Sequence, residues 1–284
     1  MLIALAAISW GTTGSVTTVL VAQAGVGPLV IGAVRMVVAA ALLLLLARAR
    51  GAIRIDRADR WRCVALGVCM AGFQAAYFSA VTLTGIAIAA LIAICSSPVL
   101  IAVLAAATLG ERLTPRVVLA LVLGVAGTGL LIAGPRSAAD LAAPFVVGVL
   151  LALAAGLAYA LYVVIAKASL ARTEPLPLAG VNFAVAAAVM APALAGPDVS
   201  RQLALGWPWL LYLGAVATAG AYAVYTIGLR DVPASVAGIA SLLEPLTATV
   251  LGVALFGERL GAAGVVGAGL LLAAFTVLAA RRTA

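Results

Sequence analysis

Ten apolar stretches, each about twenty residues long, constrain the fold of this chain more than any other feature. A helix of this length matches the ~30 Å hydrocarbon core of a bilayer. The stretches also lack the alternation of polar and apolar residues that is typical of barrel strands. We therefore expect an all-α integral membrane protein with ten transmembrane helices, at roughly 2–21, 28–47, 62–82, 86–108, 116–134, 144–166, 178–196, 208–228, 234–256 and 262–280.

Composition agrees with this fold class. Hydrophobic residues make up 66% of the chain and charged residues 9%, whereas a soluble domain has about 25% charged residues. The first stretch follows Met1 with no basic segment, so we expect it to be kept as a helix rather than cleaved as a signal peptide. The chain has no histidine and no CxxC motif, so we expect neither a metal site nor a cofactor.

Two of the stretches are related by an internal duplication. Residues 87–113 superimpose on residues 234–260 with a shift of 147 and no gaps, which places Pro98 on Pro245 and aligns a GERL tail in each segment. Such self-similarity at a fixed shift indicates a repeated unit. We expect a single transmembrane domain over 1–284, with repeat one at 1–134 and repeat two at 144–284.

The distribution of basic residues predicts the orientation. If the N-terminus is cytoplasmic, thirteen of the seventeen basic residues fall on the inner side, and only Arg136, Arg201 and Arg259 fall outside. The positive-inside rule then places both termini in the cytoplasm of a multi-pass protein of the inner (plasma) membrane. Because each repeat has five spans, the second repeat must be inverted relative to the first. Inverted repeats commonly form a substrate site near the bilayer midplane.

Several sequence blocks carry a family resemblance. They are Trp10-Gly11, Ala33-Val34-Arg35-Met36 with Ala39-Ala40-Ala41-Leu42, residues 98–113, and Glu244-Pro245 through Leu260. Over essentially its full length the chain resembles the ten-helix, EamA-type members of the drug/metabolite transporter superfamily. The resemblance implies a secondary transporter whose helices one to four and six to nine surround a central cavity, with helices five and ten at the periphery. The aromatic content near the centre is similar to that of YddG-type amino-acid exporters.

Glu244 is the first candidate for a functional residue. It lies about eleven residues into its span, near the bilayer centre, where a charge is costly and is seldom kept without a purpose. It could bind a substrate amine or couple transport to protons. The alternative is a protonated or paired residue that packs helices, and Ser97, its counterpart in the first repeat, shows that a neutral group is tolerated there.

Pro98 and Pro245 each remove one helical hydrogen bond and kink the helix. The carbonyls of Ile94 and Ser241 are expected to be freed, and in lipid they need polar partners. We interpret the two prolines as candidate hinges that gate opposite ends of the cavity; a static kink that aids packing is the alternative.

Aromatic and amide side chains deep in the spans are the remaining candidates. Tyr222 and Tyr225 lie three residues apart, as do Tyr159 and Tyr162, and Phe73 lies four residues before Tyr77, so each pair shares a helix face. The expected substrate-binding set is Trp10, Tyr77, Phe78, Ser97, Tyr159, Tyr162, Asn182, Tyr222, Tyr225 and Glu244. Core packing is the alternative for each aromatic residue. Trp61, Trp207, Trp209 and Tyr212 lie at span ends, where aromatic residues form an interfacial belt.

Other residues are assigned structural roles. Arg35 could reach the outer interface with its long side chain, or hold a substrate carboxylate or balance Glu244. We expect Glu111 and Glu258 each to end one helix and to seat the N-terminus of the next. Prolines at 28, 115 and 208 are expected at first helical positions. Small-residue stripes in the fifth and tenth spans predict that these two helices pack together; they comprise Gly124, Gly127, Gly129, Gly264, Gly267 and Gly269.

We interpret the chain as a secondary transporter that exports small amphipathic metabolites, with amino acids, including aromatic ones, as the leading class, by alternating access. The alternative is a proton-coupled exporter of cationic drugs that uses Glu244. An intramembrane hydrolase would need an activated nucleophile with a base, and the chain has no HExxH motif. It also has no GxxxxGK[ST] loop for ATP.

The expected partners are a small-molecule substrate and the lipid bilayer. The net charge of +8 lies in the loops, so we expect no nucleic acid as a partner. We expect a monomer with internal pseudo-twofold symmetry.

Overall fold

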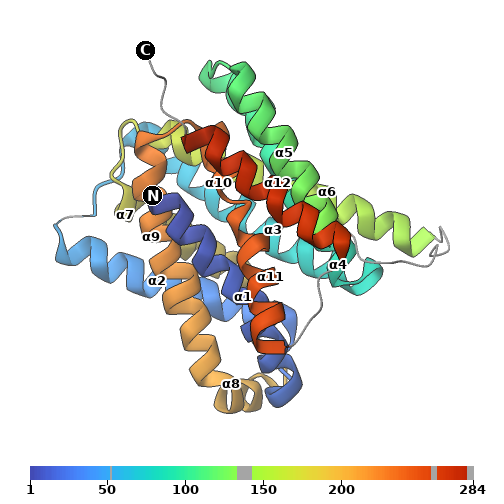
Figure 1. The fold of residues 1–284 in the computed structure, drawn as a ribbon. Helices are drawn as coiled ribbons and strands as arrows, with labels where there is room; N and C mark the ends of the chain where they lie inside the picture. Colours follow the sequence, from blue (N-terminus) through green and yellow to red (C-terminus); the bar gives the residue numbers. More distant parts are fainter. Residues whose placement is uncertain (52, 133–142, 257–260, 280–284) are drawn as a thin grey trace.

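The computed structural model is a bundle of helices (Figure 1). It describes residues 1–51, 53–132, 143–256 and 261–279. The α-helices are α1 (Leu2–Ala24), α2 (Pro28–Ala49), α3 (Arg60–Thr84), α4 (Ile86–Leu109), α5 (Pro115–Ile132), α6 (Ala143–Ser169), α7 (Pro175–Met190), α8 (Val199–Gly214), α9 (Ala221–Asp231), α10 (Ala234–Ala240), α11 (Leu243–Phe256) and α12 (Ala262–Ala279). The described residues also form three short segments. Two are 3₁₀ helices, η1 (Arg57–Asp59) and η2 (Ala191–Leu194), and one is a π-helix, η3 (Ala215–Gly220).

These helices form the ten expected spans. In the described part of the chain, eight helical stretches are long and apolar enough to cross a membrane, and α5 and α12 supply two shorter apolar helices. The eighth span is one continuous stretch, Val199–Asp231, built from α8, η3 and α9. The ninth span is interrupted between α10 and α11. The protein is therefore an all-α multi-pass membrane protein.

Local chemistry explains most helix ends. Pro28 begins α2, where its missing N–H leaves no helical bond unmade. Pro115 likewise begins α5, and the Thr114 hydroxyl accepts a hydrogen bond from the Val117 N–H at 3.4 Å, as predicted for a capping residue. The prediction for Pro208 is wrong. That proline lies inside α8, because the helix begins nine residues earlier, at Val199.

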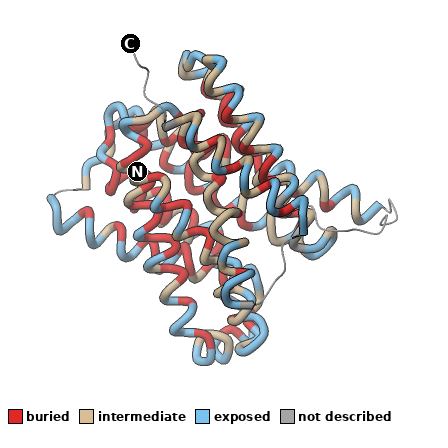
Figure 2. Tube along the Cα trace, viewed as in Figure 1, coloured by how far each residue is buried: buried red, intermediate tan, exposed pale blue. Residues whose placement is uncertain are grey.

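The most buried segments lie at the centre of the bundle (Figure 2). There α2 packs on α7, α3 and α4 pack on α6, and α1 packs on α9 and α11. The paired helices α5 and α12 lie side by side at one edge (Figure 1). This layout leaves a core of aromatic and small residues enclosed by α1, α3, α6, α7 and α9.

The contacts between the two halves are reciprocal. A Cβ atom added at Gly67 would lie 2.5 Å from Val185 Cβ, and one added at Gly214 would lie 2.5 Å from Val38 Cβ. The shift of 147 carries Gly67 onto Gly214 and Val38 onto Val185. A glycine of each half therefore packs against a valine of the other half, and the two glycines and the two valines are equivalent positions. A twofold axis between the repeats requires this pattern. This pattern supports the duplication, and the repeat boundaries remain a prediction.

The predicted packing of the fifth span against the tenth is confirmed. A Cβ atom at Gly127 of α5 would lie 2.8 Å from the Gly267 carbonyl oxygen of α12, so the two backbones approach closely. The expectation is wrong for Gly129 and Gly269, since added Cβ atoms there would meet nothing within 4 Å. Those two glycines face away from the contact.

Polar contacts join the helices at one end of the bundle. We call it the arginine-rich end, because it includes Arg48, Arg50, Arg54 and Arg57. The carboxylate of Glu111, after α4, accepts hydrogen bonds from the Ala234 N–H and, at 3.1 Å, from the Ser235 N–H at the start of α10. The Ser235 hydroxyl donates to the same carboxylate at 2.6 Å. Lys167 Nζ donates to the carbonyls of Leu229 and Arg230 at the end of α9, both at 2.9 Å.

Asp59 is the centre of a second set of contacts at this end. Its buried carboxylate forms ion pairs with Arg62 and Arg172, both at 2.9 Å, and accepts a hydrogen bond from the Thr173 hydroxyl at 2.8 Å. Glu111 does seat a helix N-terminus, but the prediction that it seats the next helix, α5, is wrong, because the helix is α10 of the second half. The corresponding prediction for Glu258 lies outside the described residues.

Candidate central site

Aromatic rings from five helices meet at the centre of the bundle. Trp10 of α1 lies 4.9 Å from Tyr222 and 5.1 Å from Tyr225 of α9, and 6.4 Å from Tyr159 of α6, measured between ring centroids. Aromatic pairs at 4.5–7 Å attract each other beyond simple burial. We call the whole set the aromatic cluster; it comprises Trp10, Phe73, Tyr77, Phe78, Tyr159, Tyr162, Phe183, Tyr222 and Tyr225.

The three predicted same-face pairs are confirmed. Phe73 stacks on Tyr77 at 5.9 Å and Tyr159 on Tyr162 at 6.3 Å, while Tyr222 and Tyr225 meet edge to face at 6.1 Å. Phe73 also contacts Tyr159 at 5.8 Å, which joins α3 to α6. Tyr77 contacts Phe78 at 5.8 Å. The structure thus brings nine of the ten predicted binding residues, all except Ser97, into or beside one cluster.

Several polar atoms in the aromatic cluster and beside it are buried, and no hydrogen bond to them is found among the described residues. They are Trp10 Nε1, the hydroxyls of Tyr159 and Tyr225, and Asn182 Oδ1. The Asn182 amide nitrogen donates to the Leu178 carbonyl at 2.9 Å, which leaves its oxygen free. A buried unpaired polar atom is costly. The hydroxyls of Tyr159 and Tyr225 lie within reach of each other and of the Ser241 side chain, whereas Trp10 Nε1 and Asn182 Oδ1 have no hydrogen-bond partner within the described residues. All four belong to residues that the sequence predicts as substrate-binding.

Glu244 lies at the break in the ninth span. It is the second residue of α11, directly after the turn formed by Ser241 and Leu242. Its side chain is half-buried, and within the described ranges its carboxylate forms no hydrogen bond or ion pair. The carboxylate lies within electrostatic range of Arg35, Tyr77, Tyr159 and Tyr222. The carboxylate therefore lies near the aromatic cluster.

The local backbone explains how this acid is presented. Pro245 lacks an N–H, so the helix cannot bond through it to Ser241. The Ser241 carbonyl, which was predicted to lose this bond and to need another partner, accepts from the Glu244 N–H at 3.0 Å in a tighter turn. In the first half, Pro98 lies inside an unbroken α4, where Ser97 Oγ donates to the Ala93 carbonyl at 2.6 Å. The two proline-containing spans thus differ in form.

Ser97 lies apart from the aromatic cluster. It is buried, and its hydroxyl donates within α4 and also approaches the Gly156 carbonyl of α6 at 3.4 Å. Its hydroxyl joins two helices in this structure, and its role as a ligand stays a prediction. The hinge roles of Pro98 and Pro245 also stay predictions.

Arg35 turns inward, so the expectation that it reaches the outer interface is wrong. Its side chain is 9% exposed, and Nε donates to the Thr218 hydroxyl at 3.0 Å. Thr218 lies in the π-helical segment η3, and its own hydroxyl donates to the Leu213 carbonyl at 2.7 Å. The attraction between the charges of Arg35 and Glu244 also favours the inward position.

Sequence reasoning missed three contributors to this region. Phe183 is fully buried and contacts Tyr222 at 4.8 Å, and the sulfur of Met70 accepts a hydrogen bond from the Tyr222 hydroxyl at 3.9 Å. Gly11 brings α1 against α11, since an added Cβ atom would lie 2.8 Å from the Glu244 carbonyl oxygen. Only Gly11 left a signal in the sequence, as part of the Trp10-Gly11 pair.

Comparison with known proteins agrees with this architecture. The EamA-like transporter family matches residues 1–133 and 146–280. The uncharacterized transporter YwfM of Bacillus subtilis (strain 168) is 36% identical over 283 residues, covering 99% of this chain and 93% of the relative. An uncharacterized transporter of Archaeoglobus fulgidus (strain ATCC 49558 / DSM 4304 / JCM 9628 / NBRC 100126 / VC-16) is 29% identical over 221 residues, covering 77% of this chain and 76% of the relative.

A solved protein crystal structure superposes with a TM-score of 0.82 at 25% sequence identity, covering 98% of this chain and 95% of the other. The ten-span helical fold and these relatives define a multi-pass membrane transporter. The chain belongs to the EamA-like transporter family. The predicted membership of the drug/metabolite transporter superfamily is thereby confirmed.

Proposed function

We propose that this transporter exports small amphipathic metabolites, with amino acids, including aromatic ones, as the leading class, by alternating access. One observation carries the proposal. The unpaired carboxylate of Glu244 lies near an aromatic cluster, in and beside which the buried Trp10 Nε1 and Asn182 Oδ1 have no partner among the described residues. Binding sites for small molecules combine apolar walls with a few converging polar groups in this way.

A zwitterionic amino acid suits the chemistry of this site. Its ammonium group would pair with Glu244, and its apolar side chain would lie against Trp10 and the tyrosines. Arg35 uses Nε for Thr218, and its other guanidinium nitrogens would attract the carboxylate. The amide oxygen of Asn182 would accept a further hydrogen bond from the substrate.

The distribution of basic residues supports the membrane orientation on which the proposal rests, and the direction of transport follows from the family resemblance. The basic residues of the arginine-rich end, which include Arg48, Arg50, Arg54 and Arg57, place this end in the cytoplasm under the positive-inside rule. Both termini would lie on the same side. The five-span repeats would then have inverted topology, with the central site near the midplane.

Alternating access requires an element that can change shape beside the ligand. The break between α10 and α11 is such an element, because its turn carries Glu244 and Pro245. Ligand binding at Glu244 would bias the geometry of the turn, and the two half-helices would move relative to each other. Transport by the pair of inverted repeats would follow from this local change.

Counterflow in proteoliposomes tests the proposal. The purified protein is reconstituted, loaded with an unlabelled compound, and assayed for uptake of the same labelled compound across amino acids, sugars and cationic dyes. The proposal predicts counterflow for amino acids, strongest for those with large apolar side chains. Counterflow with sugars alone, or with no compound of the panel, would contradict it.

The alternative function is a proton-coupled exporter of cationic drugs, which the unpaired Glu244 also favours. In this mechanism the carboxylate would bind a proton and the cation in turn. A Glu244→Gln variant separates the two functions. Continued counterflow of neutral amino acids with loss of cationic dye transport would support the alternative, whereas loss of amino-acid counterflow would support the principal proposal.

A further inference from the structure

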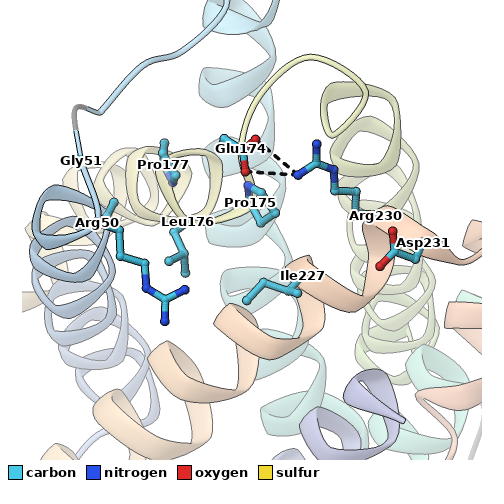
Figure 3. A pocket seen from close by; sticks show the side chains of 10 residues that line it. Arg50, Gly51, Glu174, Pro175, Leu176, Pro177, Ile227, Arg230 and Asp231 are labelled. Carbon is cyan, nitrogen blue, oxygen red and sulfur yellow. Dashed lines mark hydrogen bonds and ion pairs between the residues drawn. The ribbon is translucent and has the colours of Figure 1, made fainter.

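A cavity lies at the arginine-rich end, and no residue of the aromatic cluster lines it. Its volume is about 560 Å³, which is within the range of small-molecule sites. The end of α2, the start of α7 and the end of α9 form its walls (Figure 3). The lining residues are Ala47, Arg50, Gly51, Glu174, Pro175, Leu176, Pro177, Ile227, Arg230 and Asp231.

The charges around this cavity leave one cation available. Arg230 pairs with Glu174 at 3.2 Å, and Asp231 is attracted by the nearby Lys167. Arg50 forms no ion pair within the described ranges. Figure 3 shows its guanidinium group close to Leu176, with Ile227 on the far side of the cavity. A free guanidinium group beside apolar side chains can bind a ligand that has a carboxylate and an apolar part.

Helices that line the cavity continue toward the central site. Ile227 is five residues from Tyr222, which corresponds to about 8 Å along α9. Leu176 is seven residues from Phe183, or about 10 Å along α7. Phe183 and Tyr222, whose rings are in contact at 4.8 Å, are the cluster residues on these two helices. The α2 helix continues from Arg50 toward Arg35 in the same way.

We propose that this cavity is the cytoplasmic capture site of the transporter, where Arg50 binds the substrate carboxylate before the Phe183–Tyr222 contact opens. The inference rests on the proposed export of amino acids. The apolar floor of Leu176 and Ile227 holds the substrate side chain. Asp231, on the opposite side of the cavity from Arg50, disfavours substrates with a second negative charge.

Capture at one face predicts a kinetic effect that depends on the side of the membrane. An Arg50→Gln variant loses a charge-assisted hydrogen bond to the substrate, so the half-saturating concentration at the cytoplasmic face should rise roughly tenfold or more. The half-saturating concentration at the opposite face should not change. An Arg50→Lys variant keeps the charge and should recover part of the loss.

The measurement uses zero-trans uptake of a labelled amino acid into inside-out vesicles and into spheroplasts. Arg48→Gln is the matched control, because Arg48 is also exposed at the end of α2 but does not line the cavity. The control should match the wild-type protein at both faces. Protein amounts in the membrane are compared for all variants, so that poor folding is recognised.

Three outcomes would count against the proposal, and they differ in what they reject. If the wild-type protein transports no amino acid, the proposed function fails and the capture site fails with it. If the wild-type protein transports and Arg50→Gln changes both faces equally or neither face, only the capture site is rejected. If the effect of Arg50→Gln appears only in vesicles that contain anionic phospholipid, the cavity binds a lipid headgroup instead of substrate.

Discussion

At the scale of single residues, the position of Glu244 depends on Gly11, which packs against the α11 backbone. Gly11 lets α1 approach α11 so closely that a Cβ atom would lie 2.5 Å from Thr247 Cβ and 2.8 Å from the Glu244 carbonyl oxygen. Because the nearest polar contact is backbone, a neighbouring side chain cannot relieve it by rotation. The position of Glu244 is therefore set partly from a different helix.

A Gly11→Ala substitution should displace the α11 backbone at Glu244. We expect counterflow to fall on the order of ten- to a hundredfold, since small errors in the position of binding groups reduce turnover strongly. The overpacked contact should also cost about 1–3 kcal/mol of stability. Gly14→Ala is the control on the same helix, because a Cβ atom at Gly14 would meet nothing within 4 Å. Equal activity of the two variants would contradict this account.

The sequence predicts residues of this site only where residue type and depth are informative. Trp10 and the paired tyrosines are large, polar-tipped side chains deep in apolar spans, so they could be identified. Phe183 could not, because a phenylalanine in an apolar helix is most often plain core. The direction of Arg35 depends on Thr218, a partner 183 residues away. No local pattern encodes that contact.

At the scale of elements, the ninth span depends on a contact between the two halves. Glu111 accepts hydrogen bonds from the backbone N–H groups of Ala234 and Ser235, the first residues of α10. A helix as short as α10 has few internal hydrogen bonds, so a cap contributes a large share of its stability. The first GERL motif thus holds a broken helix of the other half in position.

A Glu111→Ala substitution removes this cap. We expect a loss of about 1 kcal/mol in stability, which is typical for losing a capping side chain. The apparent melting temperature in detergent should fall by a few degrees, as read by light scattering or tryptophan fluorescence. Arg112→Ala, at the neighbouring exposed position, should behave as the wild-type protein does. A Glu111→Ala protein that melts at the wild-type temperature would show that the contact is not stabilising.

Element boundaries were predictable where a breaker residue marks them. Pro28 and the Thr114-Pro115 pair fix the starts of α2 and α5. Pro208 was predicted to begin a helix, but the helix already begins at Val199 and continues through the residues before the proline. The π-helical segment Ala215–Gly220 has no comparable signal in an alanine-rich stretch. It is stabilised by long-range contacts such as the one between Arg35 and Thr218.

At the scale of the whole molecule, the reciprocal contacts of Gly67 with Val185 and of Gly214 with Val38 relate the two halves by a twofold axis. The number of spans was predictable, because hydrophobic length alone decides it. The inverted orientation is predicted from the odd number of spans, since two repeats of five spans must enter the membrane from opposite sides, and charge counting predicts which side is cytoplasmic. Arg54 and Arg201 are equivalent positions under the shift of 147, and both are exposed.

Inverted repeats predict that these two equivalent positions face opposite sides of the membrane. In a background with Cys63, Cys69 and Cys95 replaced by alanine, an Arg201→Cys variant in spheroplasts should react with a membrane-impermeant maleimide. An Arg54→Cys variant should react only after the membrane is permeabilised. Labelling of both variants, or of neither, in intact spheroplasts would show that the repeats share one orientation.

The central claim is that substrate binds against the aromatic cluster beside Glu244. Trp10 is the one tryptophan of the four that lies in this cluster, while Trp61, Trp207 and Trp209 are exposed at span ends. Replacing those three with phenylalanine leaves Trp10 as a single fluorescent reporter. Titration with an amino acid that shows counterflow should change its emission with saturation, and Glu244→Gln should abolish the change. A transported amino acid that leaves Trp10 emission unchanged would contradict the account.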